Sequence, residues 1–335
     1  MTSTTFITGA NGFVGLALTE HLLARGEDVV GFDLTSPDAQ ALRDFERLPG
    51  HFVMAHGDVG DAPALREAVR RHAPDRLVTL AAITADAQRE RRSPASIFEV
   101  NVGGVVSAIS AAAECGVARV VHASSGSVYG ASGRDAALLH EDSTPLRPEG
   151  LYGISKQAAE AAALRLAALH GLDLTVARLG TCFGPWERDT GVRDTPSAPL
   201  QVLRRALDGA PVRLPRAGRR DWLYVRDAAR GLAALLDAPR LPRKVYNIAA
   251  GFEWSVLDWC ARLAASEDFT RLDWRVARDG ESITIDYHAD YDRASMDARA
   301  LQRDTAFVPR YDLAASADDF LHWLRGHTPS LAHHA

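Results

Sequence analysis

Lysine is nearly absent from this chain of 335 residues. Of its 38 basic residues only Lys156 and Lys244 are lysine, so a lysine is the exception wherever it occurs. Cysteine is also scarce: Cys115, Cys182 and Cys260 lie far apart and are odd in number, which excludes a disulfide framework and a paired Cys-x-x-Cys metal site. No uninterrupted apolar run approaches the ~20 residues that span a membrane, so no membrane association is expected.

Neither sign of charge dominates the sequence. Lys and Arg number 38 against 43 Asp and Glu, a net charge of −5, which argues against nucleic acid as a partner. The 12 histidines form no His-Glu-x-x-His element, so no metal site is expected. Residues 1–5 lack the basic segment of a signal peptide. We therefore expect a cytoplasmic enzyme or binding protein that acts on a small molecule.

Short apolar strands alternate with helical patterns through most of the chain. Strands that are apolar throughout and separated by helices predict a parallel sheet covered on both faces. The expected strands are residues 5–8, 28–32, 51–55, 77–80, 119–123, 174–179 and 244–248, and the expected helices are residues 13–24, 62–72, 102–115, 151–170, 200–207 and 225–236. The predicted fold class is α/β, a doubly wound parallel sheet with a smaller mixed C-terminal domain.

Prolines mark a break in this alternation between residues 181 and 221. Loops dominate there, and regular structure returns near residue 225. We expect a nucleotide-binding domain formed by residues 1–180 and 222–250, and a substrate-binding domain formed by residues 181–221 and 251–327. Residues 328–335 are expected to be a frayed tail.

A glycine-rich turn joins the first predicted strand to the first helix. Glycines in such a turn let backbone N–H groups approach a pyrophosphate, and the helix N-terminus adds positive potential. The spacing is Gly-x-x-Gly-x-x-Gly rather than the commoner Gly-x-Gly-x-x-Gly. The candidate dinucleotide-binding residues here are Gly9, Asn11, Gly12, Phe13, Val14 and Gly15.

Two carboxylates follow the next two strands. Asp33 ends the second strand, where a carboxylate accepts from the adenosine ribose hydroxyls and repels a 2′-phosphate, and no arginine follows before Arg43. This pattern favours NAD over NADP. Asp58 follows the third strand and reaches the same edge of the sheet, where it is either an acceptor for the adenine amino group or a solvated turn residue.

Tyr152 and Lys156 are four residues apart, so they share one face of a predicted helix. An ammonium beside a phenol lowers the phenol pKa, which makes Tyr152 a candidate general acid and base. Ser125 is a candidate for orienting the same substrate oxygen. Lysine in a chain that otherwise uses arginine strengthens this interpretation, because an arginine does not replace a point-charge amine.

Taken together, these motifs resemble the extended short-chain dehydrogenase/reductases of the nucleotide-sugar epimerase/dehydratase type. The segments that carry the resemblance are residues 8–15, Asp33, Asp58, residues 80–82, 101–104, 124–130, 141–148 and 152–156, Arg178, residues 184–185, 220–221, 225–227 and 246–248. The resemblance implies a Rossmann-type domain with bound NAD, a catalytic triad of Ser125, Tyr152 and Lys156, and a homodimer through helices 102–115 and 151–169. It adds Val59, Leu80, Ala81, Ala82 and Asn101 as cofactor contacts.

The resemblance also points to substrate contacts, and some of these depart from the family pattern. The implied contacts are Thr84, Ser125, Ser127, Thr181, Arg220 and Arg278. Arg220 matches a diphosphate-binding arginine, and Arg278 resembles a second family arginine. Related dehydratases place Asp-Glu where this chain has Gly126-Ser127, and many epimerases have Asn at the position of Thr181. Missing carboxylates disfavour a 4,6-dehydratase.

Three functions remain open at this point. The first is an NAD-dependent epimerase that oxidises a secondary alcohol of a sugar or sugar nucleotide to a transient ketone and then reduces it again. The second is a dehydrogenase of a free sugar, sugar acid or other hydroxy compound that releases NADH. The third is an NAD-binding sensor without turnover, against which the complete triad argues.

Overall fold

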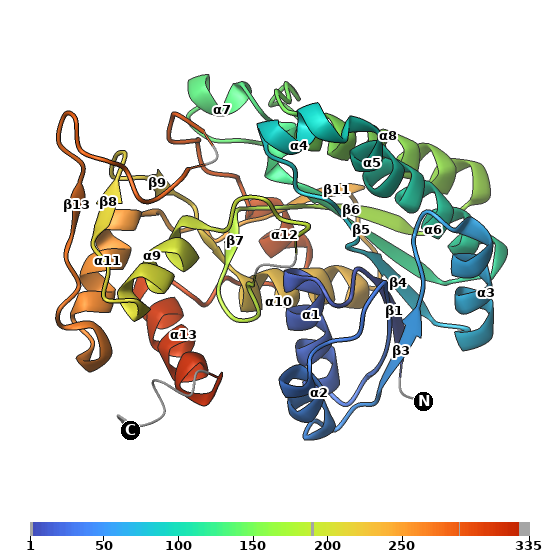
Figure 1. Ribbon diagram of the computed structural model, residues 1–335. Helices are drawn as coiled ribbons and strands as arrows, with labels where there is room; N and C mark the ends of the chain where they lie inside the picture. Colours follow the sequence, from blue (N-terminus) through green and yellow to red (C-terminus); the bar gives the residue numbers. More distant parts are fainter. Residues whose placement is uncertain (1–2, 189–190, 288, 328–335) are drawn as a thin grey trace.

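A seven-stranded parallel sheet forms the centre of the protein, described here as a computed structural model of residues 3–188, 191–287 and 289–327. The strand order is β11-β6-β5-β4-β1-β2-β3, and every neighbouring pair is parallel. The strands are β1 (Thr4–Thr8), β2 (Asp28–Asp33), β3 (Phe52–His56), β4 (Arg76–Thr79), β5 (Arg119–Ser125), β6 (Leu174–Leu179) and β11 (Val245–Ile248). The first three strands are added toward one edge of the sheet and the later ones toward the other, so the strand order switches between the neighbours β1 and β4 (Figure 1). The predicted Rossmann-type sheet is confirmed.

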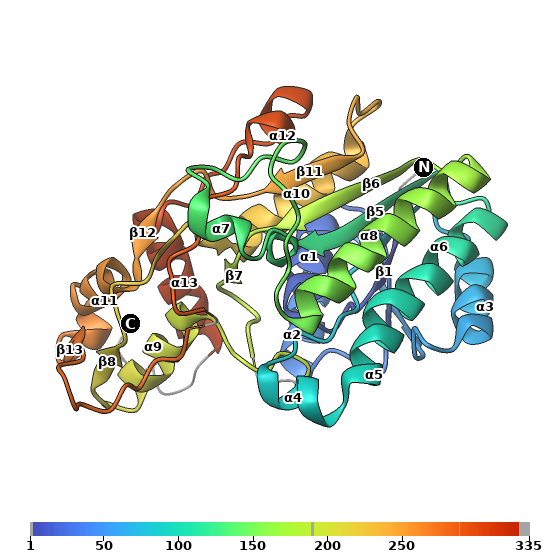
Figure 2. The same cartoon turned by 90° about the horizontal axis from the view of Figure 1, so that it is seen from above.

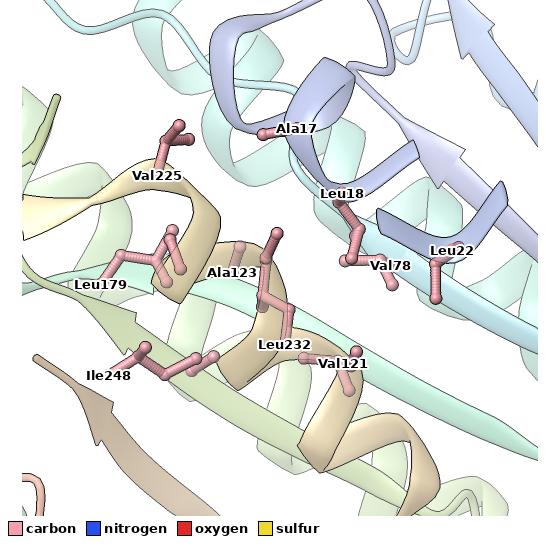
Figure 3. Close-up of a cluster of buried hydrophobic side chains, with 14 of the residues drawn as sticks. Ala17, Leu18, Leu22, Val78, Val121, Ala123, Leu179, Val225, Leu232 and Ile248 are labelled. Carbon is pink, nitrogen blue, oxygen red and sulfur yellow. The ribbon is translucent and has the colours of Figure 1, made fainter. Parts of the chain in front are cut away.

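Helices cover both faces of this sheet. One face carries α3 (Ala62–His72), α6 (Gly104–Glu114) and α8 (Leu151–His170) side by side (Figure 2). The other carries α1 (Phe13–Ala24) and α10 (Val225–Asp237), which pack against each other. Figure 3 shows the result: Leu18 and Leu22 of α1 and Leu232 of α10 meet Val78 and Val121 of the sheet. All five side chains are fully buried, so burial of apolar surface holds the layers together.

Local sequence signals explain where several of these helices begin and end. Asp61 caps α3 by accepting from the backbone N–H of Ala64 at 3.0 Å, and Pro63 occupies the first turn. Gly171 ends α8 in the left-handed conformation at φ 65°. The helix expected from residue 102 begins differently, with a π-helical turn η1 (Glu99–Gly103) before α6. Sequence periodicity does not reveal that extra residue in the turn.

A second cluster of buried side chains lies beside the sheet, at the left of Figure 1. It contains Phe183, Trp254 and Trp259, and Trp274 packs at its margin. The elements around it are β7 (Cys182–Phe183), α9 (Ala198–Leu207), β8 (Val212–Leu214), β9 (Arg219–Arg220), β10 (Leu223–Tyr224), β12 (Trp254–Ser255), α11 (Val256–Ala264), η3 (Glu267–Phe269), β13 (Trp274–Val276) and α13 (Leu313–His327). The pairs β7–β10, β9–β12 and β8–β13 form three small sheets.

One stretch that was expected in the second domain packs elsewhere. Ala300 and Leu301 of α12 (Arg299–Asp304), and Phe307 after it, belong to the same buried cluster as the central strands. Met296 and Ala298 pack with Tyr129. From about residue 296 to residue 307 the chain therefore packs with the central sheet and its neighbours, whereas residues 251–295 precede this return. The tail 328–335 lies outside the described residues.

The remaining helices connect these layers. They are α2 (Ala39–Glu46), α4 (Ala87–Arg92), α5 (Pro94–Phe98), η2 (Gly126–Val128) and α7 (Ser132–Asp135). The stretch Pro94–Glu114, from α5 through α6, has the length and mean hydropathy (1.4) of a membrane span. Its α6 part packs between α3 and α8, which is the position of a core helix (Figure 2).

Candidate functional site

A cleft of about 400 Å³ opens at the carboxyl ends of β1, β4, β5 and β6. Ligands of open α/β sheets bind at this edge, where the strand order reverses. The cleft brings together the following residues that the sequence singled out: Gly9, Gly12, Phe13, Val14, Gly15, Leu80, Ala82, Thr84, Ser125, Ser127, Tyr152, Lys156, Thr181 and Arg220. They come from both parts of the chain, so the fold assembles one site from distant segments.

The glycine-rich turn is packed too closely for any other residue at two of its positions. Gly9 has φ 72°, and a Cβ there would lie 2.5 Å from the backbone nitrogen of Ala81. A Cβ on Gly15 would collide with the carbonyl oxygen of Gly9. These glycines leave the N-terminus of α1 bare, as a dinucleotide pyrophosphate requires. Ala81 thus supports the turn and lies behind the cleft wall.

Asp33 lies beside this turn, at the end of β2. Its carboxylate accepts from the backbone N–H groups of Asn11 at 3.0 Å and Leu34 at 2.7 Å. Burial raises the pKa of Asp33, and the hydrogen bonds from the backbone oppose that rise. The carboxylate is therefore held rigidly at the place where an adenosine ribose binds in such folds.

Asp58 and Val59 follow β3 at the same edge of the sheet and do not line the cleft. The Asp58 side chain is exposed and accepts from the Gly60 N–H at 2.8 Å, which is the geometry of a turn. Val59 is buried against Gly104 of α6. Neither arrangement prevents contact with an adenine ring at this edge.

Asn101 has a supporting position behind the cleft. Its side chain, which is fully buried, accepts from the Ile83 N–H at 2.8 Å and donates to the Ile83 carbonyl at 3.0 Å and to the Ser155 hydroxyl at 2.9 Å. Ser155 in turn donates to the carbonyl of Tyr152 at 2.8 Å. These bonds occupy both amide hydrogens. Asn101 therefore fixes the loop after β4 to the first turn of α8. The family resemblance implies a direct contact between Asn101 and the cofactor instead.

Tyr152 and Lys156 both line the cleft from α8, as their spacing predicts. The side chains of Ser125 and Thr84 also line the cleft, and as hydrogen-bonding neighbours both lower the pKa of the Tyr152 phenol. Lys156 is buried, and its ammonium donates to the carbonyl oxygen of Ala123 at 2.5 Å. Ser125 is oriented by Ser127, whose N–H and hydroxyl each lie 3.1 Å from its Oγ.

The expected lowering of the Tyr152 pKa by Lys156 is wrong for this structure. Burial raises the pKa of Tyr152, and the hydrogen bonds from Ser125 and Thr84 and the charge of Arg193 only partly oppose it. Burial also lowers the pKa of Lys156 to about 8. The spacing of the two residues showed that they share a face but gave no measure of how deeply that face is buried.

Arginines line the substrate end of the cleft. Arg220 donates to the hydroxyl of Thr181 at 3.1 Å, and within the described residues no carboxylate forms an ion pair with it. Burial and the neighbouring charge of Arg293 lower the pKa of Arg220 to about 10. By contrast, Arg213 and Arg226, which lie within seven residues of Arg220 in the sequence, are paired with acidic residues. Arg220 is therefore poised for an anion that the chain does not supply.

Arg278 was expected in the site and lies elsewhere. It is exposed, in a turn where its N–H donates to Glu281 at 3.0 Å, and it does not line the cleft. The second arginine beside Arg220 is instead Arg293, which pairs with the buried Asp221 at 3.5 Å. A Cβ on Gly126 would lie 2.7 Å from its guanidinium. Residue type alone does not distinguish Arg278 from Arg293. The fold of the chain between them decides which of the two reaches Asp221.

These features define a class of protein: a Rossmann-fold enzyme whose cleft joins a glycine-rich turn to a tyrosine, a buried lysine and an arginine. Comparison with known proteins identifies the family. Residues 5–249 match the model of the NAD dependent epimerase/dehydratase family. The chain belongs to this family, whose members are NAD-dependent enzymes.

Relatives and solved structures agree with this assignment. The chain is 30% identical to a dTDP-glucose 4,6-dehydratase of Streptomyces griseus over 340 residues, which cover 98% of this chain and 95% of that protein. It is similar to MoeE5 in complex with UDP-glucuronic acid and NAD, with 27% identity, a TM-score of 0.76 and coverage of 97% and 100%. It is also similar to DesIV, a dTDP-glucose 4,6-dehydratase from Streptomyces venezuelae with NAD bound (26%, TM-score 0.76, coverage 98% and 99%).

Proposed function

We propose that this protein is an NAD-dependent epimerase of a sugar nucleotide. The observation that carries the proposal is one cleft that Tyr152, Ser125 and Thr84 line together with the glycine-rich turn and with Arg220, which has no ion pair among the described residues. The turn fits NAD, and Arg220 fits a diphosphate. The relatives described above act on or bind nucleotide-linked sugars, which supports the same substrate class.

In the proposed reaction Tyr152 takes the proton of a sugar hydroxyl, and the hydrogen on the same carbon leaves as hydride. Bound NAD supplies the hydride acceptor, a positively charged ring that also favours the phenolate. Ser125 and Thr84 hold the substrate oxygen and the phenol in one hydrogen-bonded group. Tyr152 returns the proton when the ketone is reduced from its other face. Net epimerisation leaves the oxidation state of the cofactor unchanged.

Two observations favour epimerisation over dehydration. Gly126 and Ser127 carry no carboxylate beside Ser125. Among the described residues, the acidic side chains that line the cleft are Glu90 and Glu149, and both are engaged. Glu90 accepts from the N–H of Leu151 at 2.6 Å, and Glu149 accepts from Arg134 at 2.7 Å. A dehydratase needs a free acid and base to eliminate water.

The test is a titration of the NAD-loaded protein with UDP, GDP and dTDP. We expect micromolar binding of one of them, and Arg220→Ala should weaken that binding at least about tenfold, the loss of one charged hydrogen bond. Lack of binding by all three would move the assignment to a dehydrogenase of a free sugar or sugar acid. The nucleotide released on denaturation separates these two reactions, because an epimerase retains NAD and a dehydrogenase exchanges it.

The assembly and the division of the chain are part of the proposal. We propose a homodimer through α6 and α8, whose outer positions on α8 are Ile154, Ala158, Ala161 and Arg165. Small side chains permit close helix packing. Residues 1–180 and 222–250, joined by residues 296–307, would hold NAD, while 181–221, 251–295 and 308–327 would hold the substrate, in a cytoplasmic enzyme. Sedimentation of the parent and of Ala161→Arg would test the dimer.

A further inference from the structure

Arg193 lines the cleft at a place that none of the sequence motifs described above predicts. Its side chain, 19% exposed, lines the cleft and pairs with Glu187 at 2.7 Å. It also donates to the carbonyl of Cys182 at 3.4 Å, and its guanidinium lies 5.7 Å from the centre of the Phe13 ring. The arginine thus stands between the glycine-rich turn and the catalytic end of the site.

The backbone around Arg193 is fixed to a residue of the reaction centre. The N–H of Thr84 donates to the carbonyl of Val192 at 2.8 Å, and the N–H of Asp194 donates to the carbonyl of Thr84 at 3.1 Å. Asp194 is further held by an ion pair with Arg89. Because Thr84 and Tyr152 line the same cleft, this ladder holds Arg193 in the part of the site that contains the reacting phenol.

The electrostatics agree with this placement. The charge of Arg193 favours the phenolate of Tyr152 and the thiolate of Cys182. Its partner Glu187 is buried and is itself held by the N–H of Ser197 at 2.7 Å and the Ser197 hydroxyl at 2.6 Å. Within the part of the chain that the structure describes, Glu187 and the Cys182 carbonyl are its polar partners. A guanidinium has five N–H donors, so donors remain for a ligand.

We propose that Arg193 binds a carboxylate carried by the sugar close to the reacting carbon, so that the substrate is a sugar acid rather than a neutral sugar. This inference rests on the proposed function and names its substrate class. A guanidinium recognises a carboxylate through parallel N–H donors. Arg220, elsewhere in the same cleft, binds the diphosphate, so the two arginines contact the two ends of one ligand.

The experiment compares matched ligands that differ only in a carboxylate. The pairs are UDP-glucuronic acid with UDP-glucose, and glucuronic acid with glucose, each titrated by calorimetry into the NAD-loaded protein. We expect the acid to bind more tightly than its neutral partner by about ten- to a hundredfold in at least one pair, as charged hydrogen bonds imply. Arg193→Lys should retain part of this preference.

Removing Arg193 alone would leave Glu187 buried without its partner, so the decisive variant is Glu187→Gln/Arg193→Met. It should lose the preference for the acid while binding the neutral sugar nucleotide and NAD as before. Arg188→Met is the matched control on the same segment. Arg188 lines the same cleft beside the glycine-rich turn, where it contacts Asn11 at 2.6 Å and Asp38, and its loss should leave the preference for the acid intact.

The possible failures are distinguishable. Equal binding of acid and neutral ligand would overturn the role of Arg193 while leaving the epimerase proposal in place. A double variant that loses NAD affinity but keeps the preference for the acid would assign Arg193 to the cofactor diphosphate and overturn the inference. If no member of either pair binds, this inference fails, and the proposed function fails with it when UDP, GDP and dTDP do not bind either.

Discussion

Replacing Lys156 with methionine should abolish activity and, at neutral pH, make the fold more stable. The ammonium of Lys156 is buried in α8 with the carbonyl of Ala123 as its partner. Burial lowers its pKa from 10.5 to about 8, with the more distant Glu160 opposing this. In the unfolded chain the same lysine has its ordinary pKa. Folding therefore requires the protein to hold a charge in a place that disfavours it.

The size of this effect follows from the shift. A pKa lowered by about 2.5 units corresponds to about 3 kcal/mol of destabilisation. Because the folded pKa lies below the unfolded one, the unfolded state binds more protons between pH 8 and 10.5. The penalty is thus fully present below about pH 8 and disappears as the pH rises through about 10.5. Lys156→Met also loses one hydrogen bond at every pH, at a cost of about 1 kcal/mol.

The expected result is a change of sign with pH. Lys156→Met should be about 2 kcal/mol more stable than the parent near pH 7 and about 1 kcal/mol less stable above about pH 10.5. For a chain of this length 3 kcal/mol corresponds to about 4 °C in Tm. The assay is thermal unfolding followed by circular dichroism on nucleotide-free protein across this range. A difference between the two proteins that does not change with pH would refute the reasoning, since other groups cancel in the comparison.

Three further outcomes test the rest of the site. Tyr152→Phe should lower kcat by about 10²–10⁴-fold while NAD affinity, measured by titration, stays unchanged, because only the transferable proton is lost; retained activity would remove Tyr152 from the mechanism. The parent should bind NAD at least about tenfold more tightly than NADP, and Asp33→Ala should narrow that ratio, since the 2′-phosphate no longer meets a carboxylate. Asn101→Ala leaves the Ile83 N–H and carbonyl unpaired and should cost about 1–3 kcal/mol of stability by urea unfolding, with kcat falling as well; Ser155→Ala, which removes the bonds to Asn101 and to the Tyr152 carbonyl but leaves both Ile83 groups paired, is the control, and equal losses from both variants would contradict this account.

The parallel sheet and much of the candidate site follow from local sequence patterns. Apolar strands alternating with helices predict the parallel sheet, and the sheet places the carboxyl ends of β1, β4 and β5 at one edge. Glycine spacing predicts the turn at Gly9, and a separation of four residues puts Tyr152 and Lys156 on one side of α8. Each of these predictions depends on residues that lie close together in the sequence or within one strand.

The parts that local patterns missed depend on long-range packing. Arg193 shares the cleft with Tyr152 because residues 192 and 194 pair with Thr84, more than a hundred positions earlier. Arg293 reaches Arg220 through Asp221, and the turn at Arg278 offers the same residue type without that partner. The number of arginines in the chain gives no indication of which ones are paired. Side-chain pairing and burial, which decide charge in a site, are properties of the assembled fold.

The treatment of buried positive charge separates the structural arginines from the functional groups. Arg178 is nearly as buried as Lys156, yet its pKa is raised, because Glu160 pairs with it at 2.8 Å and the Tyr129 hydroxyl accepts from it. Lys156 and Arg220 have lowered pKa values because burial outweighs the acidic groups near them. A carboxylate therefore stabilises the buried guanidinium of Arg178. Within the described residues Arg220 has no such ion pair, so its burial costs folding free energy that a bound anion would offset. The same reasoning predicts that a diphosphate ligand should stabilise the parent protein more than the Arg220→Ala variant.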